Sequence, residues 1–158
     1  MSLETQNVAI VDTQFGKRCK VVMPSNIYGA TLGDEVFIGP FVEIQNGVTI
    51  GEQTRIQSHT FICELVEIGK KSFIGHGVMF INDLFSPGQP SFGDRNLYKP
   101  TKIGDNVSIG SNATILPVSI CDHSVIGAGA VVTKDIAEPG IYAGNPARFL
   151  KSLPRVGA

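Results

Sequence analysis

Apolar residues recur at every sixth position between residues 32 and 80. A period of six matches neither the 3.6-residue period of an α-helix nor the two-residue period of a strand. It is instead the hexapeptide repeat of a parallel β-helix. Leu, Ile or Phe occupies the first place of nine consecutive blocks, at positions 32, 38, 44, 50, 56, 62, 68, 74 and 80.

Each block is expected to form one short strand and one corner, so that three blocks close one triangular coil. The first place faces inward and must be apolar. The fifth place also faces inward near a corner, where only a small or β-branched side chain fits. Those places hold Val36, Val42, Val48, Thr54, Thr60, Val66, Ser72 and Val78. Glycine at second places (33, 39, 51, 69 and 75) suits a corner that a Cβ would crowd or that needs a positive φ.

A weaker copy of the repeat precedes this run. Leu32 arrives one residue early relative to it, which predicts a shortened corner near residues 28–30. The predicted first places of this copy are Ala9, Phe15, Val21 and Ile27, and the predicted fifth places are Thr13, Cys19, Ser25 and Thr31.

Residues 83–100 interrupt the repeat with three prolines, two glycines and no periodic apolar positions. Insertions in a solenoid are extruded as loops, often on the binding face, so a functional loop is expected here. The repeat then resumes at Ile103, Ile109 and Ile115, with Val107, Ala113 and Ser119 at fifth places. It slips by one residue after Pro117 and continues at Ile120, Ile126 and Val132. Six or seven coils are therefore predicted.

The rhythm ends at residue 137. Pro146 followed by residues 147–151 predicts a short C-terminal helix that caps the open end of the solenoid. The sequence thus indicates a single all-β domain over residues 1–158. Its β-helix spans about 8–136, its extruded loop about 83–100 and its C-terminal cap about 137–158.

Charge and composition point to no charged macromolecular partner. The net charge is −1 and charged residues make up 17% of the chain, so no strong field favours nucleic acid or an anionic membrane. No apolar run of 18 residues predicts a membrane span. Three cysteines without a secretion signal indicate structural thiols in the reducing cytoplasm.

Two histidines are expected to share one outer edge of the solenoid. His59 and His76 occupy the same side of successive coils, and Ser111 and Ala128 continue the column of His76 when the loop is counted as an insertion. Imidazole is the side chain best suited to accept a proton near neutral pH. A binding site is therefore predicted along this edge.

Other polar residues carry two interpretations. Asn82 and Asp83 stand where the chain enters the loop, and we expect Asn82 to lie next to the two histidines. Asp83 either binds a substrate or simply caps the start of the loop. His123 belongs to a distant coil and is interpreted as a solvated surface residue.

Several stretches resemble the hexapeptide-repeat acyltransferases, over residues 10–150. They are the hexapeptide run, ILP at 115–117, IGAGAVVTKD at 126–135 and AGNPAR at 143–148. More narrowly, FVEIQ at 41–45, IQSHTFIC at 56–63 and IGHGVMFIND at 74–83 resemble bacterial N-acetyltransferases of dTDP- or UDP-linked 3-amino sugars. One departure is Val118 directly after Pro117, where the family usually has a glycine first.

The resemblance implies a left-handed β-helix, a cytoplasmic homotrimer, and acetyl transfer from acetyl-CoA, bound between subunits, to a nucleotide-linked amino sugar without a metal. The product would serve cell-surface glycan synthesis. The implied catalytic residues are His76, Asn82 and His59, with Asp83, Glu43 and Gln57 binding the sugar nucleotide. The implied cofactor-binding residues are Gly110, Ser111, Ala128, Gly129, Lys134, Asn145, Pro146 and Arg148, with Lys134 and Arg148 meeting the CoA phosphates.

Three other functions remain possible on the same fold. A γ-class carbonic anhydrase needs two zinc-binding histidines five residues apart, but Ile81 and Glu64 stand five residues after His76 and His59. A non-catalytic scaffold or sugar-binding trimer would keep the repeat without the chemistry. An O-acetyltransferase acting on a sugar or an amino acid would use the same wall of the solenoid.

In the N-acetyltransferase that the resemblance implies, the proton of the attacking amine would go either to a histidine or to the leaving thiolate.

Overall fold

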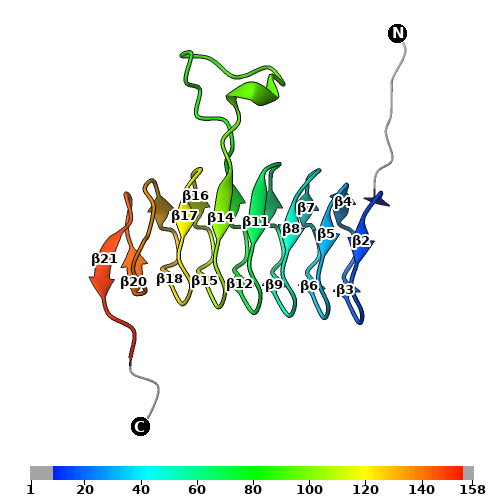
Figure 1. Ribbon diagram of the computed structural model, residues 1–158, viewed down its shortest axis with the longest axis horizontal. Helices are drawn as coiled ribbons and strands as arrows, with labels where there is room; N and C mark the ends of the chain where they lie inside the picture. The colour runs from blue at the N-terminus through cyan, green and yellow to red at the C-terminus, as the bar shows by residue number, and fades with distance from the viewer. Residues whose placement is uncertain (1–8, 155–158) are drawn as a thin grey trace.

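The computed structural model describes residues 9–154, which wind into a parallel β-helix of about seven coils. The coils advance in a left-handed sense along the long axis (Figure 1). The predicted fold class is confirmed. The predicted start of the β-helix near residue 8, and the last four residues of the predicted cap, lie outside the described part of the chain. No described helix is long and apolar enough to cross a membrane.

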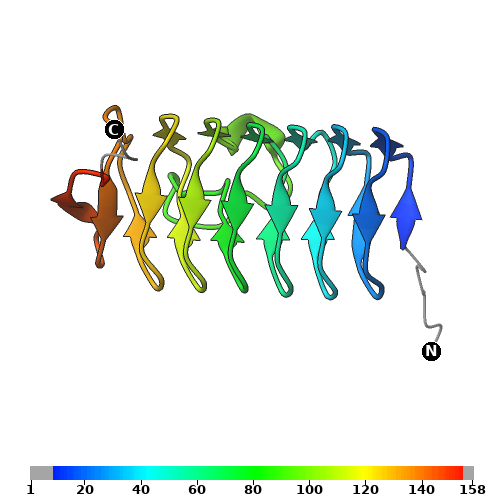
Figure 2. The ribbon, with the colours of Figure 1, turned by 90° about the horizontal axis from the view of Figure 1, so that it is seen from below.

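Three sheets form the walls of the solenoid; their strands lie side by side and are parallel except for the last strand of sheet C (Figure 2). Sheet A contains β1 (Ile10–Val11), β4 (Asn26–Tyr28), β7 (Glu43–Ile44), β10 (Phe61–Ile62), β13 (Met79–Phe80), β16 (Thr114–Ile115) and β19 (Val131–Val132). Sheet B contains β2 (Gln14–Phe15), β5 (Thr31–Leu32), β8 (Thr49–Ile50), β11 (Val66–Ile68), β14 (Thr101–Ile103) and β17 (Ser119–Ile120). Sheet C contains β3 (Lys20–Val21), β6 (Phe37–Ile38), β9 (Arg55–Ile56), β12 (Phe73–Ile74), β15 (Ser108–Ile109), β18 (Val125–Ile126), β20 (Ile141–Ala143) and β21 (Arg148–Lys151).

The first-place residues stack on one another in the interior. In sheet C, Ile38 pairs with Ile56, Ile56 with Ile74, Ile74 with Ile109, and Ile109 with Ile126. All five side chains are essentially inaccessible to solvent. Stacked coils that bury identical positions explain why the repeat is so regular, because each apolar residue packs against its equivalents in the coils before and after it.

Hydroxyl side chains at buried fifth places are satisfied by the backbone of the next coil. Thr54 Oγ1 donates to Gly69 O at 2.8 Å, Thr60 Oγ1 to Gly75 O at 3.0 Å, and Ser72 Oγ to Gly104 O at 3.1 Å. A buried hydroxyl without such a partner would be costly. Small polar residues are therefore accepted at these places because the corner supplies an acceptor.

Crowding explains the glycines at second places. A Cβ at Gly51 would lie 2.5 Å from Lys70 N in the next coil, and one at Gly75 would lie 2.7 Å from Ser111 N. None of the second-place glycines of the strong run has a positive φ. The left-handed conformation falls instead at fourth places, as at Gln53 and His59.

Three predicted register positions are wrong by one residue. Ile10, not Ala9, pairs with Ile27 and takes the first place of its block. Ala30, not Thr31, is buried, which confirms the shortened corner but moves its inward residue. Val118, not Ser119, is buried in the same way. In the last two cases the block has five residues, so the inward position falls one residue earlier.

Residues 83–100 project from the body of the solenoid between β13 and β14 and carry the 3-10 helix η1 (Arg95–Leu97) (Figure 1). Asp83 holds the stem by accepting hydrogen bonds from Phe85 N at 2.9 Å and Ser91 N at 2.8 Å. Arg95 ties the loop to the solenoid through Glu64, with Nη2 and Oε1 2.6 Å apart.

The predicted C-terminal helix is wrong. The chain forms an antiparallel hairpin of β20 and β21 that extends sheet C beyond β18. The open edge of sheet C satisfies the backbone of β20, and the turn back lets Phe149 pack edge-on against Tyr142, with ring centroids 5.6 Å apart. The cap of the solenoid is therefore a continuation of the sheet.

Candidate active site

The three corners of the solenoid share one backbone but carry different side chains. We call the corner between sheets C and A the histidine corner, because it holds His59 and His76. The corner between sheets B and C is the carboxylate corner, with Asp34, Asp105 and Asp122. The corner between sheets A and B is the loop corner, because residues 83–100 leave from it.

The histidine corner unites most of the residues that the sequence singled out. His59 follows β9 and His76 follows β12, so the two are in adjacent coils. Ser111 and Ala128 lie in the next two coils in the column of His76, as the pairing of β12, β15 and β18 requires. The predicted column is therefore confirmed.

The polar side chains at this corner lack partners; His59 and His76 are exposed and Ser111 is half-buried. Among residues 9–154, no hydrogen bond or ion pair is made by the side chains of His59, His76 or Ser111. His59 stacks on Phe41, with ring centroids 4.9 Å apart and an angle of 29° between the ring planes. Groups that bond to nothing within the fold are free to bind a ligand.

Backbone N–H groups at third places of this corner are also free. Within the described chain, Ser111 N and Ala128 N donate to no acceptor. The next coil cannot supply a side-chain acceptor for Ser111 N, because Ala128 ends in a methyl group. Gly75 and Gly110 keep these amides uncovered, since a Cβ at Gly75 would lie 2.7 Å from Ser111 N and one at Gly110 would collide with Ala128 N. The corner thus offers two exposed donors to a carbonyl or an oxyanion.

The turn of the C-terminal hairpin continues this corner beyond the last coil. Val131 N donates to Gly144 O at 3.0 Å and Ala147 N to Val131 O at 2.8 Å, which folds residues 144–147 against β19. Asn145 and Pro146 form the exposed part of this turn. Gly129 occupies the fourth place of the last full corner, in the coil against which this turn folds.

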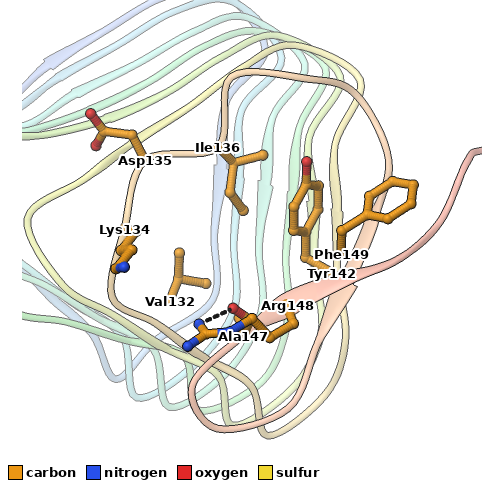
Figure 3. A pocket seen from close by; sticks show the side chains of 8 residues that line it. All are labelled: Val132, Lys134, Asp135, Ile136, Tyr142, Ala147, Arg148 and Phe149. Atoms are coloured by element: carbon orange, nitrogen blue, oxygen red, sulfur yellow. Dashed lines mark hydrogen bonds between the residues drawn. The ribbon is translucent and has the colours of Figure 1, made fainter.

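A hollow of about 310 Å³ opens at the same end of the solenoid (Figure 3). It lies between the last coil, which contributes Lys134, and β21, which contributes Arg148. Both side chains are exposed, and Arg148 Nη1 donates to Ala147 O at 3.0 Å. Two cations at the rim of one hollow can receive phosphate groups. Its full lining is Val132, Lys134, Asp135, Ile136, Tyr142, Ala147, Arg148 and Phe149.

Glu43 and Gln57 flank the histidine corner on opposite sides. Gln57 takes the second place in the coil of His59, where the neighbouring coils have glycine. Glu43 begins β7 on the outer face of sheet A, where its Oε1 accepts a hydrogen bond from Tyr28 Oη at 3.0 Å. Burial of the phenol raises the pKa of Tyr28, and the hydrogen bond to Glu43 raises it further.

The loop corner holds Asn82 and Asp83, away from the histidines. Sheet A lies between the two corners, so the expectation that Asn82 stands next to His59 and His76 is wrong within one chain. Asn82 Nδ2 donates to Glu64 O at 3.3 Å. The N–H groups of Ser91 and Phe85 donate to the carboxylate of Asp83 and lower its pKa. Of the two interpretations of Asp83, the structure therefore shows the one in which it caps the start of the loop.

His123 lies at the carboxylate corner, remote from the other two histidines, as expected from its coil. Over residues 9–154, no three His, Cys, Asp or Glu side chains gather as a metal site would require.

Two residues of the histidine corner escaped the sequence analysis. Phe41 precedes His59 in the column of fourth places, and the six-residue spacing that revealed the first places also assigns it there. Asn112 follows Gly77 in that column, with its Oδ1 2.5 Å from where a Cβ of residue 77 would be. The absence of a side chain at Gly77 therefore leaves room for the amide of Asn112.

Two stretches of the chain match known repeat families. Residues 29–64 match the bacterial transferase hexapeptide family (six repeats), and residues 100–134 match the hexapeptide repeat of succinyl-transferase. The bifunctional protein GlmU of Acinetobacter baumannii (strain AYE) is 40% identical over 114 residues, which are 72% of this chain. The chain spans only 22% of the length of that relative.

Solved structures share the whole architecture. A variant of AntD, an N-acyltransferase from Bacillus cereus solved with dTDP and coenzyme A, superposes with a TM-score of 0.78 at 26% identity; the match covers 91% of this chain and 84% of that one. The hexapeptide-repeat acetyltransferase VCA0836 from Vibrio cholerae, complexed with acetyl coenzyme A, gives a TM-score of 0.65 at 25% identity, covering 81% and 73%. In its repeats and its coil geometry, the chain is therefore similar to the hexapeptide-repeat transferases.

Proposed function

We propose that this protein transfers the acetyl group of acetyl-CoA to the amino group of a nucleotide-linked 3-amino sugar, carried by dTDP or UDP. The activity belongs to a cytoplasmic homotrimer and supplies cell-surface glycan synthesis. The observation that carries the proposal is the histidine corner, where imidazoles, a hydroxyl and free amides follow one another toward a hollow with two cations. AntD, which binds dTDP and coenzyme A, supports the substrate class.

Acetyl-CoA fits along the last three coils of this corner. Lys134 and Arg148 at the hollow meet the phosphates, and Asn145 and Pro146 border the pantetheine arm. The free N–H groups of Ser111 and Ala128 donate to the pantetheine amides or to the thioester oxygen. Preorganised donors of this kind stabilise the oxyanion that develops during acyl transfer.

The reaction follows from these positions. The neutral amine attacks the thioester carbonyl carbon, a C–N bond forms, and negative charge builds on the carbonyl oxygen. The C–S bond then breaks and releases CoA thiolate. The nitrogen loses its proton either to His76, whose imidazole is exposed and unpartnered, or to the departing thiolate. His59 and Gln57 border the sugar on the side away from the cofactor.

A trimer would bring Asn82 to this chemistry. Within one chain Asn82 and His76 lie at opposite edges of sheet A. The outer face between them carries the apolar side chains of Phe61, which is half-buried, and Met79, which is 42% exposed. Packing such faces around a threefold axis juxtaposes the loop corner of one subunit and the histidine corner of the next. Asn82 would then position the amine.

The proposed function is tested by measuring thiol release from acetyl-CoA with dTDP- and UDP-linked 3-amino and 4-amino sugars. Free amino sugars and hydroxyl acceptors serve as controls, and mass spectrometry identifies the acetylated product. Turnover is expected with one nucleotide-linked 3-amino sugar.

Other results of this assay would overturn the proposal in different ways. Transfer only to hydroxyl acceptors would establish an O-acetyltransferase. Failure to bind acetyl-CoA, with the solenoid folded, would indicate a non-catalytic scaffold or sugar-binding module.

A further inference from the structure

Two stacking interactions link the same pair of coils beside the histidine corner. On the corner itself, Phe41 of one coil stacks on His59 of the next. Just before the corner, on sheet C, the guanidinium of Arg55 lies over the ring of Phe37, 4.5 Å from its centroid. Phe37 and Phe41 are in one coil, and Arg55 and His59 are in the next. We call these four residues the aromatic ledge.

Phe41 presents an apolar ring to solvent where no packing demands one. Its side chain is 57% exposed, although it contacts His59 on one side. On sheet A, next to Phe41, lies a hollow of about 190 Å³ whose rim includes Asn26 and Glu43. An aromatic ring beside an amide and a carboxylate matches the needs of a nucleobase, which stacks through its faces and hydrogen-bonds through its edge.

Arg55 is held in place but not neutralised. Its stacking on Phe37 fixes the plane of the guanidinium, and no carboxylate pairs with it among residues 9–154. A planar cation with free N–H groups binds phosphate oxygens in a bidentate manner. Arg55 is four residues from His59 in the same coil, so the cation and the ring stack flank one edge of the solenoid.

We propose that the aromatic ledge binds the nucleoside diphosphate of the sugar donor, with the base stacked on Phe41 and the phosphates on Arg55. Asn26 and Glu43 meet the polar edge of the base. Phe41, His59 and His76 lie in three successive coils, about 5 Å apart per coil along the axis. The substrate thus runs parallel to the axis, with its base at the N-terminal end and its amino sugar at His76. This inference rests on the proposed function and names the subsite that function leaves open.

The proposal is tested by titrating dTDP, UDP and thymidine into the wild type and four single variants, Phe41→Leu, Phe41→Trp, Arg55→Gln and Phe73→Leu. Phe73 is the matched control, because it is an aromatic residue of sheet C that is also exposed, at 41%. It pairs with Arg55 on the side opposite Phe37, and within residues 9–154 it stacks on no member of the ledge. Phe41→Leu should weaken binding of both nucleotides by about tenfold or more. Arg55→Gln should weaken dTDP by a similar factor and leave thymidine unchanged. Phe73→Leu should match the wild type, and Phe41→Trp should keep affinity.

CoA affinity separates the ledge from the cofactor site and from the proposed function. None of these substitutions should change the dissociation constant of CoA, which is placed at the other end of the corner. If Phe41→Leu weakens CoA instead of dTDP, the ledge binds the adenine of the cofactor and the proposal is overturned. If the wild type acetylates a nucleotide-linked amino sugar while Phe41→Leu and Phe73→Leu have equal KM values, the ledge is wrong and the proposed function stands.

Discussion

The histidine corner and the carboxylate corner have the same backbone and opposite chemistry. At both, the N–H of the fourth residue donates to the third-place carbonyl of the preceding coil, as from Asn112 to His76 at 2.8 Å and from His123 to Asp105 at 2.9 Å. At the carboxylate corner, three third-place N–H groups are satisfied as well, those of Lys17, Lys70 and Asp105. Lys70 N donates to Asp105 Oδ1 at 2.9 Å, and Asp105 N donates to Asp122 Oδ1 at 2.8 Å.

The difference lies in what the third place offers to its neighbour. An aspartate at the third place accepts a hydrogen bond from the third-place N–H of the preceding coil. Ser111 and Ala128 accept none, so the N–H groups of His76 and Ser111 stay without a partner in the described chain. Charges at the carboxylate corner are also paired with each other. Arg18 hydrogen-bonds to Glu35, which lowers the pKa of that carboxyl group. Aspartates therefore satisfy part of the carboxylate corner from within the fold, while the third-place amides and the imidazoles of the histidine corner have no partner within residues 9–154.

The sharpest test of this contrast replaces one histidine of each corner by alanine. If His76 accepts the proton of the amine, His76→Ala should lower kcat by about 10²–10⁴-fold at neutral pH with a smaller effect on KM. Raising the pH should restore part of the rate, because more amine is then neutral. His123→Ala, at the carboxylate corner, should keep wild-type kinetics. Steady-state rates over a range of pH provide the measurement.

One outcome would contradict the assignment of His76 as the proton acceptor. Full activity of His76→Ala would assign the proton to the CoA thiolate.

The shared-site arrangement is checked by refolding His76→Ala together with Asn82→Ala, each inactive alone. Random mixing should restore about a quarter of wild-type activity if each site takes one residue from each of two subunits. No recovery would place both residues in sites of single subunits.

The backbone of the solenoid was predictable from sequence because its inward positions are strictly periodic. Ile56, Ile74 and Val78 could only face the interior, and the structure buries them. The errors fall where a block has five residues, as at Ala30 and Val118, because the period alone does not say which residue is skipped. The C-terminal hairpin was missed because Phe149 packs on Tyr142, a contact that no local pattern reveals.

Outward positions were harder to interpret, because the repeat leaves them unconstrained. Spacing alone placed His59 and His76 on one edge, but it could not show that sheet A separates them from Asn82. Free amides at Ser111 and Ala128 depend on what the following coil lacks. Phe41 was overlooked because an isolated phenylalanine in a repeat reads as a packing residue until its exposure is known.

Glycine substitutions at the two corners should cost the same stability but differ in activity. Gly51→Ala places a Cβ 2.5 Å from Lys70 N, and Gly75→Ala places one 2.7 Å from Ser111 N, so each forces adjacent coils apart. Each should reduce the free energy of unfolding by about 1–3 kcal/mol. Only Gly75→Ala covers an amide of the proposed cofactor site, so only it should also raise KM for acetyl-CoA.

Denaturant unfolding and acetyl-CoA kinetics on both variants provide the comparison. Gly88→Ala has open space around its Cβ position, so it controls for a Gly→Ala change without contact between coils; its φ of +80° adds backbone strain, but within the loop only. If Gly51→Ala raises KM as much as Gly75→Ala does, the effect is general loosening of the solenoid. The claim that only the histidine corner exposes functional amides would then fail.

The smallest effect is expected at the loop corner, where Asp83 holds an insertion rather than a ligand. Ser91 N and Phe85 N stabilise its carboxylate, so its pKa in the folded protein lies below the ordinary value of 3.8. The carboxylate therefore anchors the loop fully above pH 3.8, and this anchoring is lost as the pH falls through the lowered pKa. At pH 8, Asp83→Ala should accelerate tryptic cleavage after Arg95 several-fold without shifting the melting temperature of the solenoid. Asp34→Ala, which removes an acceptor for Lys17 N at the carboxylate corner, should leave that cleavage rate unchanged. Cleavage at the wild-type rate in Asp83→Ala, or a carbon-13 titration of Asp83 above pH 3.8, would show that the loop is held by Arg95 and Glu64 alone.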